Sequence, residues 1–365
     1  MSGGPDDERA AAALALVSLP AITPARLRRL LRAHGGPQTA VAAVAAGDAA
    51  AAVGRARDPA ALARLWRARL DVPAARARVR SRRTRVWVEG DGAPFRDPGP
   101  ACPPVLLGEG EWPGALDGPR VAVVGARAAS PHGLADAAEL GAVLAANGVT
   151  VVSGMAIGVD AAAHEGALGA GGAVVGVVAT GLDVVYPRRN GSLFRRARAS
   201  GLLVSEHAYG VPPAAARFPV RNRIIAALAD AVVVVEAAER GGALITARHG
   251  AEMGRTVFAV PGSRRNRAAA GCNRLIADGA IPLLDPGDVL LAIGTGDPHA
   301  RWHPPGPGPT DPDEAAVLDA LGGEAATADQ LARRCRLAPG RIAGALRRLA
   351  QRGLVEHRRG RWWPR

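Results

Sequence analysis

The sequence predicts an α/β protein whose doubly wound, mostly parallel sheet is flanked by an all-helical domain and a small C-terminal domain. Three observations support this prediction. From residue 121 to about 293, short apolar runs alternate with helical segments, as is typical of parallel βαβ units. Residues 1–75 are rich in Ala and Leu at helical spacing. Residues 313–365 fit three helices followed by a hairpin.

The N-terminal helical domain is predicted over residues 1–75. Its segment 19–31 resembles a degenerate helix-hairpin-helix, a motif in which hairpin glycines bring backbone amides to phosphate. Ala21 and Thr23 occupy the places where those glycines would help, so a packing module is the preferred interpretation over a DNA-binding one.

The sheet domain is predicted over residues 76–293. A transition region, 76–120, contains two short expected strands at 86–88 and 105–107. The parallel strands are expected at 121–124, 149–152, 174–178, 202–204, 231–235 and 256–260, and helices at 131–147, 158–170, 190–199, 221–228 and 243–253. Ligands of such sheets bind outside the carboxyl ends of the strands, so the loops after the strands are the candidate sites.

A Gly/Pro-rich linker is predicted over residues 294–312, before the C-terminal domain at 313–365. The order of three helices and a hairpin resembles a winged helix. Arg341, Arg347 and Arg348 would lie on the polar side of the third helix, where a recognition helix meets DNA. Many winged helices bind protein instead, so both interpretations stay open.

Charge is distributed unevenly along the chain. All 46 basic residues are arginine, and the formal net charge is +13. Residues 1–100 hold 17 arginines against 9 acids and residues 301–365 hold 12 against 7, whereas the middle is balanced at 17 each. Such an excess at both ends is expected of parts that approach nucleic acid, although a simply basic surface gives the same count.

Composition also limits the class of protein. No apolar run of about 18 residues is present, so neither a transmembrane helix nor membrane binding is expected. The acidic start at residues 6–8 lacks the basic region of a secretory signal, so a cytoplasmic protein is expected. Cys102, Cys272 and Cys335 are far apart, which argues against a metal site or a disulfide framework.

The loop after the first parallel strand combines features that suit an anion. Gly125 allows a sharp turn, and Ser130 followed by Pro131 fits the start of a helix. Free amides and the helix dipole then point at one spot. Arg127 adds a cation inside the turn, which indicates a polyanion lying across the site rather than a cofactor within it.

The loop after the second parallel strand carries Ser153 and Gly154, and Asp160 and His164 follow one helical turn apart. An acid/base pair or a metal site is one interpretation of Asp160 and His164. A hydrogen bond between them that fixes the loop is preferred, because no third ligand or nucleophile accompanies them.

The loop after the third strand holds an aromatic ring, cations and an amide. Tyr186, Arg188 and Asn190 suit base stacking and phosphate contact on a single strand. A structural Tyr-Pro turn explains the same residues equally well.

A basic cluster stands at the expected start of the helix at 221–228. Arg221 and Arg223 flank Asn222 and follow Phe218. The cluster is costly to bury without anions or carboxylate partners. Glu236, at the end of the next strand, is the candidate partner.

The last loops add glycines and a further amide. Gly242 begins another helix, and Pro261-Gly262 precedes an arginine-rich stretch and then Asn273. These arginines form either a solvated loop or a phosphate tether, and their position after a strand end favours the tether.

Together these motifs resemble the DNA processing protein A family, also called the Smf family, over roughly residues 105–290. The motifs that carry the resemblance are Gly125-Ala-Arg127-Ala-Ala-Ser130, Ser153-Gly-Met-Ala-Ile-Gly158-Val-Asp160 with His164, Gly181-Leu-Asp183 with Tyr186-Pro187 and Asn190, Ser205-Glu206, Phe218-Pro-Val-Arg221-Asn-Arg223, Pro261-Gly262, and Gly271-Cys-Asn273-Arg-Leu-Ile276. The chain departs from the family at His132, where Tyr is frequent, at Gly241, where Ser is common, and at Ala270, where a small polar residue is frequent.

The resemblance implies an extended Rossmann fold, binding of single-stranded DNA, homodimers and loading of the RecA recombinase during natural transformation, with no enzyme activity and no cofactor. It implies that Arg127 and Arg188 contact DNA phosphates. The same pocket would be lined by Ser153, Gly154, Phe218, Arg221, Asn222 and Arg223. The remaining expected DNA-binding residues are Gly125, Ser130, Tyr186, Asn190, Gly242, Pro261, Gly262 and Asn273. A structural role near the site is expected for Asp160, His164, Glu206 and Glu236.

Two enzyme classes are the alternatives. A lysine-decarboxylase-like phosphoribohydrolase resembles this chain in fold but uses a Pro-Gly-Gly-x-Gly-Thr-x-x-Glu stretch, and here Pro261-Gly262 continues as Ser-Arg. An NAD(P) enzyme fits less well, because Gly125 begins no GxGxxG motif. A mediator needs no nucleophile or tuned acid/base pair, and no convincing one is present.

Overall fold

The computed structural model describes residues 5–54, 56–90, 94–95, 99, 101–111, 113–295, 311–321, 325–351, 354–358 and 360–364. The chain divides into two units, Met1–Arg301 and Trp302–Arg365, which are described separately. Most of the expected linker at 294–312 lies outside the described residues.

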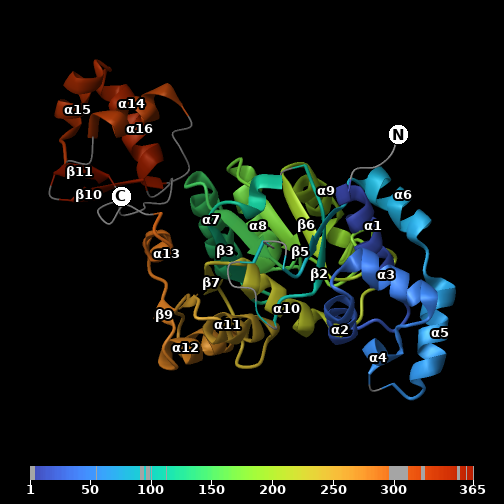
Figure 1. The fold of residues 1–365 in the computed structure, drawn as a ribbon. Helices are drawn as coiled ribbons and strands as arrows, with labels where there is room; N and C mark the ends of the chain where they lie inside the picture. Colours follow the sequence, from blue (N-terminus) through green and yellow to red (C-terminus); the bar gives the residue numbers. More distant parts are fainter. Residues whose placement is uncertain are drawn as a thin grey trace. The chain divides into compact units, whose positions relative to one another are not determined.

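A nine-stranded sheet is the centre of the described part of the first unit (Figure 1). Its order is β1-β2-β6-β5-β4-β3-β7-β8-β9. Neighbours from β6 to β9 are parallel, and β1 and β2 extend one edge as antiparallel strands. The bounds are β1 (Arg85–Val88), β2 (Val105–Glu109), β3 (Arg120–Val124), β4 (Thr150–Ser153), β5 (Val174–Val177), β6 (Gly201–Ser205), β7 (Ala231–Val234), β8 (Thr256–Ala259) and β9 (Ile281–Pro282).

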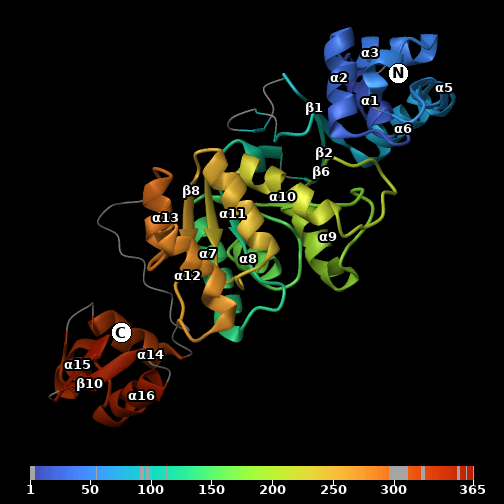
Figure 2. The same cartoon turned by 90° about the horizontal axis from the view of Figure 1, so that it is seen from below.

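Helices cover both faces of this sheet. The helices α7 (Pro131–Ala146), α8 (Val159–Gly169) and α9 (Gly191–Ala199) lie on one face, and α10 (Arg217–Leu228) and α11 (Gly242–Glu252) on the other (Figures 1 and 2). Two further helices follow, α12 (Ala270–Ala277) and α13 (Pro286–Ala292). The central order β5-β4-β3-β7-β8 is that of a doubly wound Rossmann sheet, so the expected fold class is confirmed.

The apolar runs form strands because both sheet faces are covered. Every residue of β3, β4, β5 and β7 is buried, which is why these strands consist mainly of consecutive Val and Ala residues rather than alternating apolar and polar ones. The expected parallel strands agree with these bounds to within one or two residues. One helix differs: α10 begins at Arg217, so the basic cluster lies inside the helix rather than at its start.

The N-terminal part of the first unit is helical. It contains α1 (Pro5–Val17), α2 (Pro24–His34), α3 (Pro37–Ala46), α4 (Ala50–Val53), α5 (Pro59–Arg69) and α6 (Val72–Arg82). The helices therefore continue past the expected boundary at residue 75. The indole of Trp66, fully buried, donates a hydrogen bond to the carbonyl of Pro20 at 2.9 Å. This bond ties the hairpin at 19–24 into the helical core and supports its interpretation as a packing module.

The second unit has the predicted three helices and hairpin. They are α14 (Pro312–Leu321), α15 (Ala328–Cys335), α16 (Pro339–Gln351), β10 (Val355–Arg358) and β11 (Arg361–Pro364). Val317, Leu331, Ile342, Leu346 and Leu349 form its core. In the described residues of both units, no helix combines the length and apolar character needed to cross a bilayer.

Candidate nucleic-acid interface

A cleft of about 610 Å³ opens at the carboxyl ends of β3 and β7. The strand order reverses between these two strands, and ligands of doubly wound sheets bind at this reversal point. Gly125 and Ala126 after β3 form one wall, and Ala237 and Ala238 after β7 form another. The sequence rule that selected the loops after the strands therefore placed the cleft correctly.

The turn after β3 is held close to α8. A Cβ atom on Gly125 would lie 2.6 Å from the side chain of Val159, so only glycine fits here. The exposed Arg127 follows, with its guanidinium carbon 5.0 Å from the centre of the Phe218 ring. A cation at this distance over a ring face is attracted by the ring quadrupole.

The start of α7 is not an open anion site. The hydroxyl of Ser130 accepts from the amide of Gly133 at 3.1 Å and donates to the Glu236 carboxylate at 2.5 Å. The backbone amide of Ser130 also donates to Glu236, at 3.1 Å. The chain's own carboxylate therefore occupies the expected anion position, and Glu236 is not the partner of the α10 arginines.

Two aromatic rings meet at the mouth of the cleft. The ring centres of Tyr186 and Phe218 are 5.4 Å apart with planes inclined at 34°. Tyr186 is 41% exposed, although a large aromatic side chain is usually well buried. Arg127, Phe218 and Tyr186 thus form a continuous stack drawn from three separate segments of the chain.

Two buried and oppositely charged side chains, Arg221 and Asp160, form the floor of the cleft. Arg221 is 4% exposed and donates to the carbonyl of Gly154 at 2.7 Å and to the side chain of Asn222 at 3.2 Å. The Asp160 carboxylate accepts from the amides of Gly154 and Ala156 at 3.1 and 3.4 Å. Burial lowers the pKa of Arg221 to about 10, an effect that the charge of Asp160 opposes. Burial likewise raises the pKa of Asp160, and Arg221 opposes that shift.

His164 does not bond Asp160, so the expected Asp–His hydrogen bond is wrong. Both ring nitrogens of His164 are buried and make no hydrogen bond of ordinary geometry among the described residues. Burial lowers its pKa to about 4, so the ring is neutral at pH 7. Asp160 is held instead by backbone amides, which the spacing of the two residues on one helix face cannot reveal.

Several expected lining residues lie behind the cleft or beside it. The Ser153 hydroxyl is fully buried and donates to the carbonyl of Val123 at 2.6 Å. A Cβ on Gly154 would lie 2.4 Å from Arg221, so this glycine gives the guanidinium its space. Arg223 is ion-paired with Glu206, away from the cleft lining. Ser153, Gly154 and Arg223 therefore support the site from outside the cleft. The expectation that these three residues line the cleft is wrong.

The remaining expected residues hold loops near the cleft. The amide of Asn190 donates to the carbonyls of Met155 and Ala156 at 3.0 and 3.1 Å, which ties the loop after β5 to the loop after β4. Arg188 is exposed in the turn just before α9, outside the lining. Asn273 and Gly262, next to Pro261, bond each other reciprocally at 3.1 and 2.9 Å.

The start of α11 forms the side of the cleft that sequence reasoning described least fully. Gly241 and Gly242 line the cleft, and the helix has no side-chain cap. The hydroxyl of Thr246 is 1% exposed and has no hydrogen-bond partner in the described structure. Arg240 is exposed at the rim. The sequence analysis did not select Thr246 or Arg240 as site residues. The signal that could have found them is their position on either side of the Gly241-Gly242 pair.

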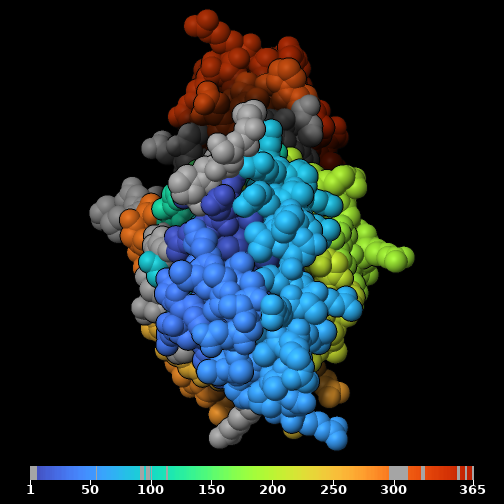
Figure 3. All heavy atoms as spheres, turned by 45° about the vertical axis from the view of Figure 1, so that its right-hand side comes forward, coloured from blue at the N-terminus to red at the C-terminus, as the bar shows by residue number. Residues whose placement is uncertain are grey.

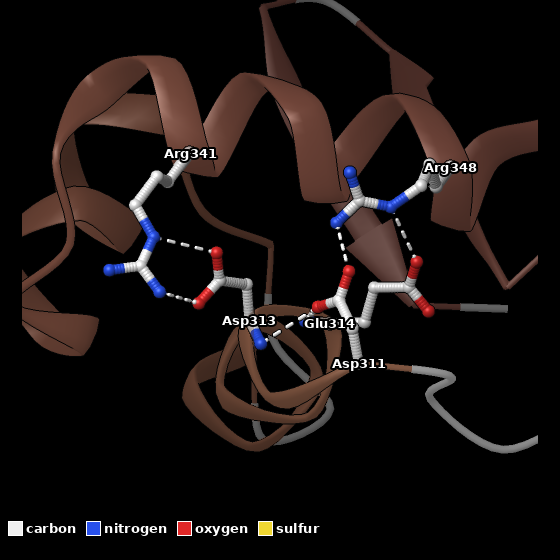
Figure 4. A network of polar contacts seen from close by, with 5 residues as sticks. All are labelled: Asp311, Asp313, Glu314, Arg341 and Arg348. Carbon is white, nitrogen blue, oxygen red and sulfur yellow. Dashed lines mark hydrogen bonds and ion pairs between the residues drawn. The ribbon is translucent and has the colours of Figure 1, made fainter.

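The arginines expected to face DNA in the winged helix are largely neutralised within that unit (Figure 4). Arg341 forms two hydrogen bonds with Asp313, one of them at 2.8 Å. Arg348 bonds Glu314 at 2.8 Å and also pairs with Asp311. The acidic start of α14 therefore neutralises Arg341 and Arg348. Arg347, the third of these arginines, is exposed and forms no ion pair among the described residues, so the DNA-binding and protein-binding interpretations both stay open.

Comparisons with known proteins agree with this geometry. The family model described as "DNA recombination-mediator protein A" matches residues 96–294, and "DprA winged helix domain" matches residues 302–361. The "Putative DNA processing protein DprA" of Mycobacterium tuberculosis is 43% identical over 257 residues, 68% of this chain and 66% of that protein. "Protein Smf" of Escherichia coli is 41% identical over 215 residues, 56% of this chain and 57% of that protein. Each match thus spans just under two thirds of the relative or less.

Two solved structures extend the comparison. DNA processing protein A from Streptococcus pneumoniae superposes with a TM-score of 0.65 at 30% identity, over 83% of this chain and 100% of that one. DNA processing protein A from Helicobacter pylori, whose structure is described as giving insights into a unique single-stranded DNA binding mode, superposes with a TM-score of 0.50 at 27% identity. The match covers 57% of this chain and 94% of that one. Because the recombination-mediator model covers more than half of the sequence, the chain belongs to the DNA recombination-mediator protein A (DprA/Smf) family.

Proposed function

We propose that the cleft binds single-stranded DNA and that the protein is a non-enzymatic recombination mediator. The observation that carries this proposal is the exposed stack of Arg127, Phe218 and Tyr186 at the cleft mouth. Aromatic faces stack on any unpaired base, and an adjacent arginine contacts the phosphate or stacks in turn. A duplex keeps its bases stacked on one another and so offers no such partner.

The charges of the cleft match the two parts of a nucleotide. Arg127 and Arg240 stand at the rim without an acidic partner in the described structure, where a phosphate backbone would run. The uncapped start of α11 adds backbone amides that suit an anion. The floor of Arg221 and Asp160 is neutral as a pair, which suits an uncharged base edge.

The hydroxyl of Thr246 supplies the polar contact that a base edge needs inside the cleft. A buried hydroxyl without a partner costs free energy, and a ligand that bonds it recovers that cost. Purines and pyrimidines both present donors and acceptors on their edges. A bond of this kind is compatible with loose sequence preference.

A mediator role is favoured over the phosphoribohydrolase alternative by the state of the acidic residues. Among the described lining residues Asp160 is the only carboxylate, and it is engaged with two amides and Arg221. His164 is sealed beneath the floor. Neither group is placed to move a proton at the cleft mouth.

The finer parts of the proposal are loading of the RecA recombinase in natural transformation, formation of homodimers and a cytoplasmic location. They rest on the family resemblance, and single-strand binding draws further support from the Helicobacter pylori relative. RecA must nucleate on single strands, so a protein that holds a strand through its bases and releases it is suited to deliver it.

The direct test is fluorescence anisotropy of the full chain with a labelled single strand and the matching duplex across a salt series. Tighter, salt-sensitive binding to the single strand is expected. Equal or absent binding to the two would refute the proposal and favour the enzyme alternative. RecA loading is then measured as filament growth on single strands coated with single-strand-binding protein, which this chain should accelerate.

A further inference from the structure

The helical domain carries an unusual concentration of arginine beside the sheet edge. Residues 76–85, which span most of α6 and the start of β1, contain six arginines and no acidic residue. Figure 3 shows α5 and α6, in light blue, as one band on the surface of this domain. Such a density of like charge destabilises the folded state unless partners offset it.

Half of these arginines have partners. On one flank of α6, Arg76 and Arg80 pair with Glu8 and Asp7 of α1 at 3.4 and 3.2 Å. Arg83 lies 3.9 Å from Glu111. These three charges are therefore accounted for within the protein.

The other flank of α6 presents two arginines to a tyrosine instead of an acid. The guanidinium carbons of Arg78 and Arg82 lie 5.3 and 5.9 Å from the centre of the Tyr209 ring. Both arginines are exposed, and in the described structure neither pairs with a carboxylate. The Tyr209 hydroxyl is fixed by Glu109 at 2.6 Å and Thr84 at 2.5 Å, so the ring has one orientation. Glu109 is itself paired with Arg198 at 3.4 Å.

Tyr209 stands on a loop that leads directly into the cleft. Four residues further along the chain, Pro213 lines the cleft, so the two Cα atoms are at most about 14 Å apart. The same loop is bonded to the loop after β5, through Gly210 to Asp183 at 2.7 Å and Gly181 to Val211 at 2.9 Å. The loop after β5 in turn carries Tyr186 at the cleft mouth.

The geometry points to a second nucleic-acid contact on the helical domain, in which Arg78, Arg82 and Tyr209 bind the backbone of a single strand that leaves the cleft. This inference rests on the proposed function of the cleft. Two guanidinium planes held on a ring offer surfaces for a base and forked N–H groups for phosphate. Their distance from the cleft is short enough for one continuous strand to reach both places.

The test compares two double variants of the full chain on short and long labelled oligo(dT). Arg78→Ala with Arg82→Ala removes the proposed contact. Arg76→Ala with Arg80→Ala removes the same charge from the same helix at the same spacing and is the matched control. A short strand of about 3 nucleotides, about 10 Å long at about 3.4 Å per nucleotide, fills the cleft without reaching α6, whereas one of about 30 reaches both places.

The first double variant is expected to bind the short strand like the wild type. Its affinity for the long strand should fall about 25-fold near 0.1 M salt, and the salt slope should decrease by about 1.4, which is about 0.7 for each of two phosphate contacts. The control should leave both strands unchanged. Unchanged long-strand binding in the first variant, or an equal loss in the control, would overturn the inference.

The same experiment keeps this inference apart from the proposed function. If the wild type binds neither strand, or if Arg127→Ala binds the short strand as tightly as the wild type, the cleft proposal fails. If Arg127→Ala weakens the short strand while the α6 variants leave the long strand unchanged, only the second contact fails. Arg78, Arg80 and Arg82 are exposed and Arg76 is half-buried, and equal thermal midpoints check that the fold is retained.

Discussion

Replacing Arg127 by alanine isolates the contribution of one cation at the cleft mouth. Arg127 is exposed and its described contact is with the Phe218 ring, so its removal should lower folding stability by no more than about 1 kcal/mol. Losing one phosphate contact reduces the salt slope for a single strand by about 0.7, which is about fivefold in affinity at 0.1 M salt. The contact with the Phe218 ring is made within the protein whether or not DNA is bound, so it does not add to this loss, and about a fivefold loss of affinity is expected overall.

Anisotropy with a labelled single strand, measured at several salt concentrations, gives both the affinity and the slope. Arg195→Ala is the matched control, because Arg195 is exposed on α9 and lies outside the cleft lining. An unchanged slope for Arg127→Ala would remove this residue from the DNA path. An equal loss for Arg195→Ala would mean that only net charge is being measured.

Three further outcomes are expected. Glu236→Ala should lower the free energy of unfolding by on the order of 1–3 kcal/mol in a urea titration, because the amide and hydroxyl of Ser130 lose their buried acceptor. Between pH 6.5 and 4 the unfolded chain binds a proton at His164 that the folded chain excludes, so the free energy of unfolding should fall on acidification by up to about 3 kcal/mol. His164→Leu should lose that part of the pH dependence. The same dependence of stability on pH in the variant and the wild type would contradict this expectation. Arg348→Ala should lower the thermal midpoint of the second unit, since it frees the start of α14, while single-strand affinity stays constant; a matching loss of affinity would return α16 to the DNA path.

The sheet could be predicted because its physical cause is local. The run from Val121 to Val124 is apolar at every position. This pattern is typical of a strand that is covered on both faces, because the side chains on both of its faces are then buried. The strand order itself was not predicted, because the apolar pattern of a strand does not encode its neighbours in the sheet. The edge of the sheet that carries the cleft was predicted, because ligands of such sheets bind outside the carboxyl ends of the strands.

The partners of the charged residues could not be predicted in the same way. Glu236 was the one carboxylate expected to meet the arginines of α10, and Asp160 was expected to bond His164. Which carboxylate each arginine meets depends on the rotation and depth of α10 over the sheet, and no local pattern encodes these. Glu236 instead satisfies the start of α7, and Asp160 lies with Arg221 in the floor.

The spacing of Arg221 and Arg223 nevertheless predicts that the two arginines have different partners. Residues two apart on a helix point in nearly opposite directions, so Arg221 and Arg223 had to leave α10 on different sides. Arg221 enters the cleft floor, and Arg223 meets Glu206 behind it. Neither charge is then free for a ligand, and the cationic character of the cleft passes to its rim, to Arg127 and Arg240. A cleft with a neutral floor and a cationic rim is suited to a chain whose charge runs outside its bases, and a free nucleotide whose phosphate enters the floor would gain no net attraction there.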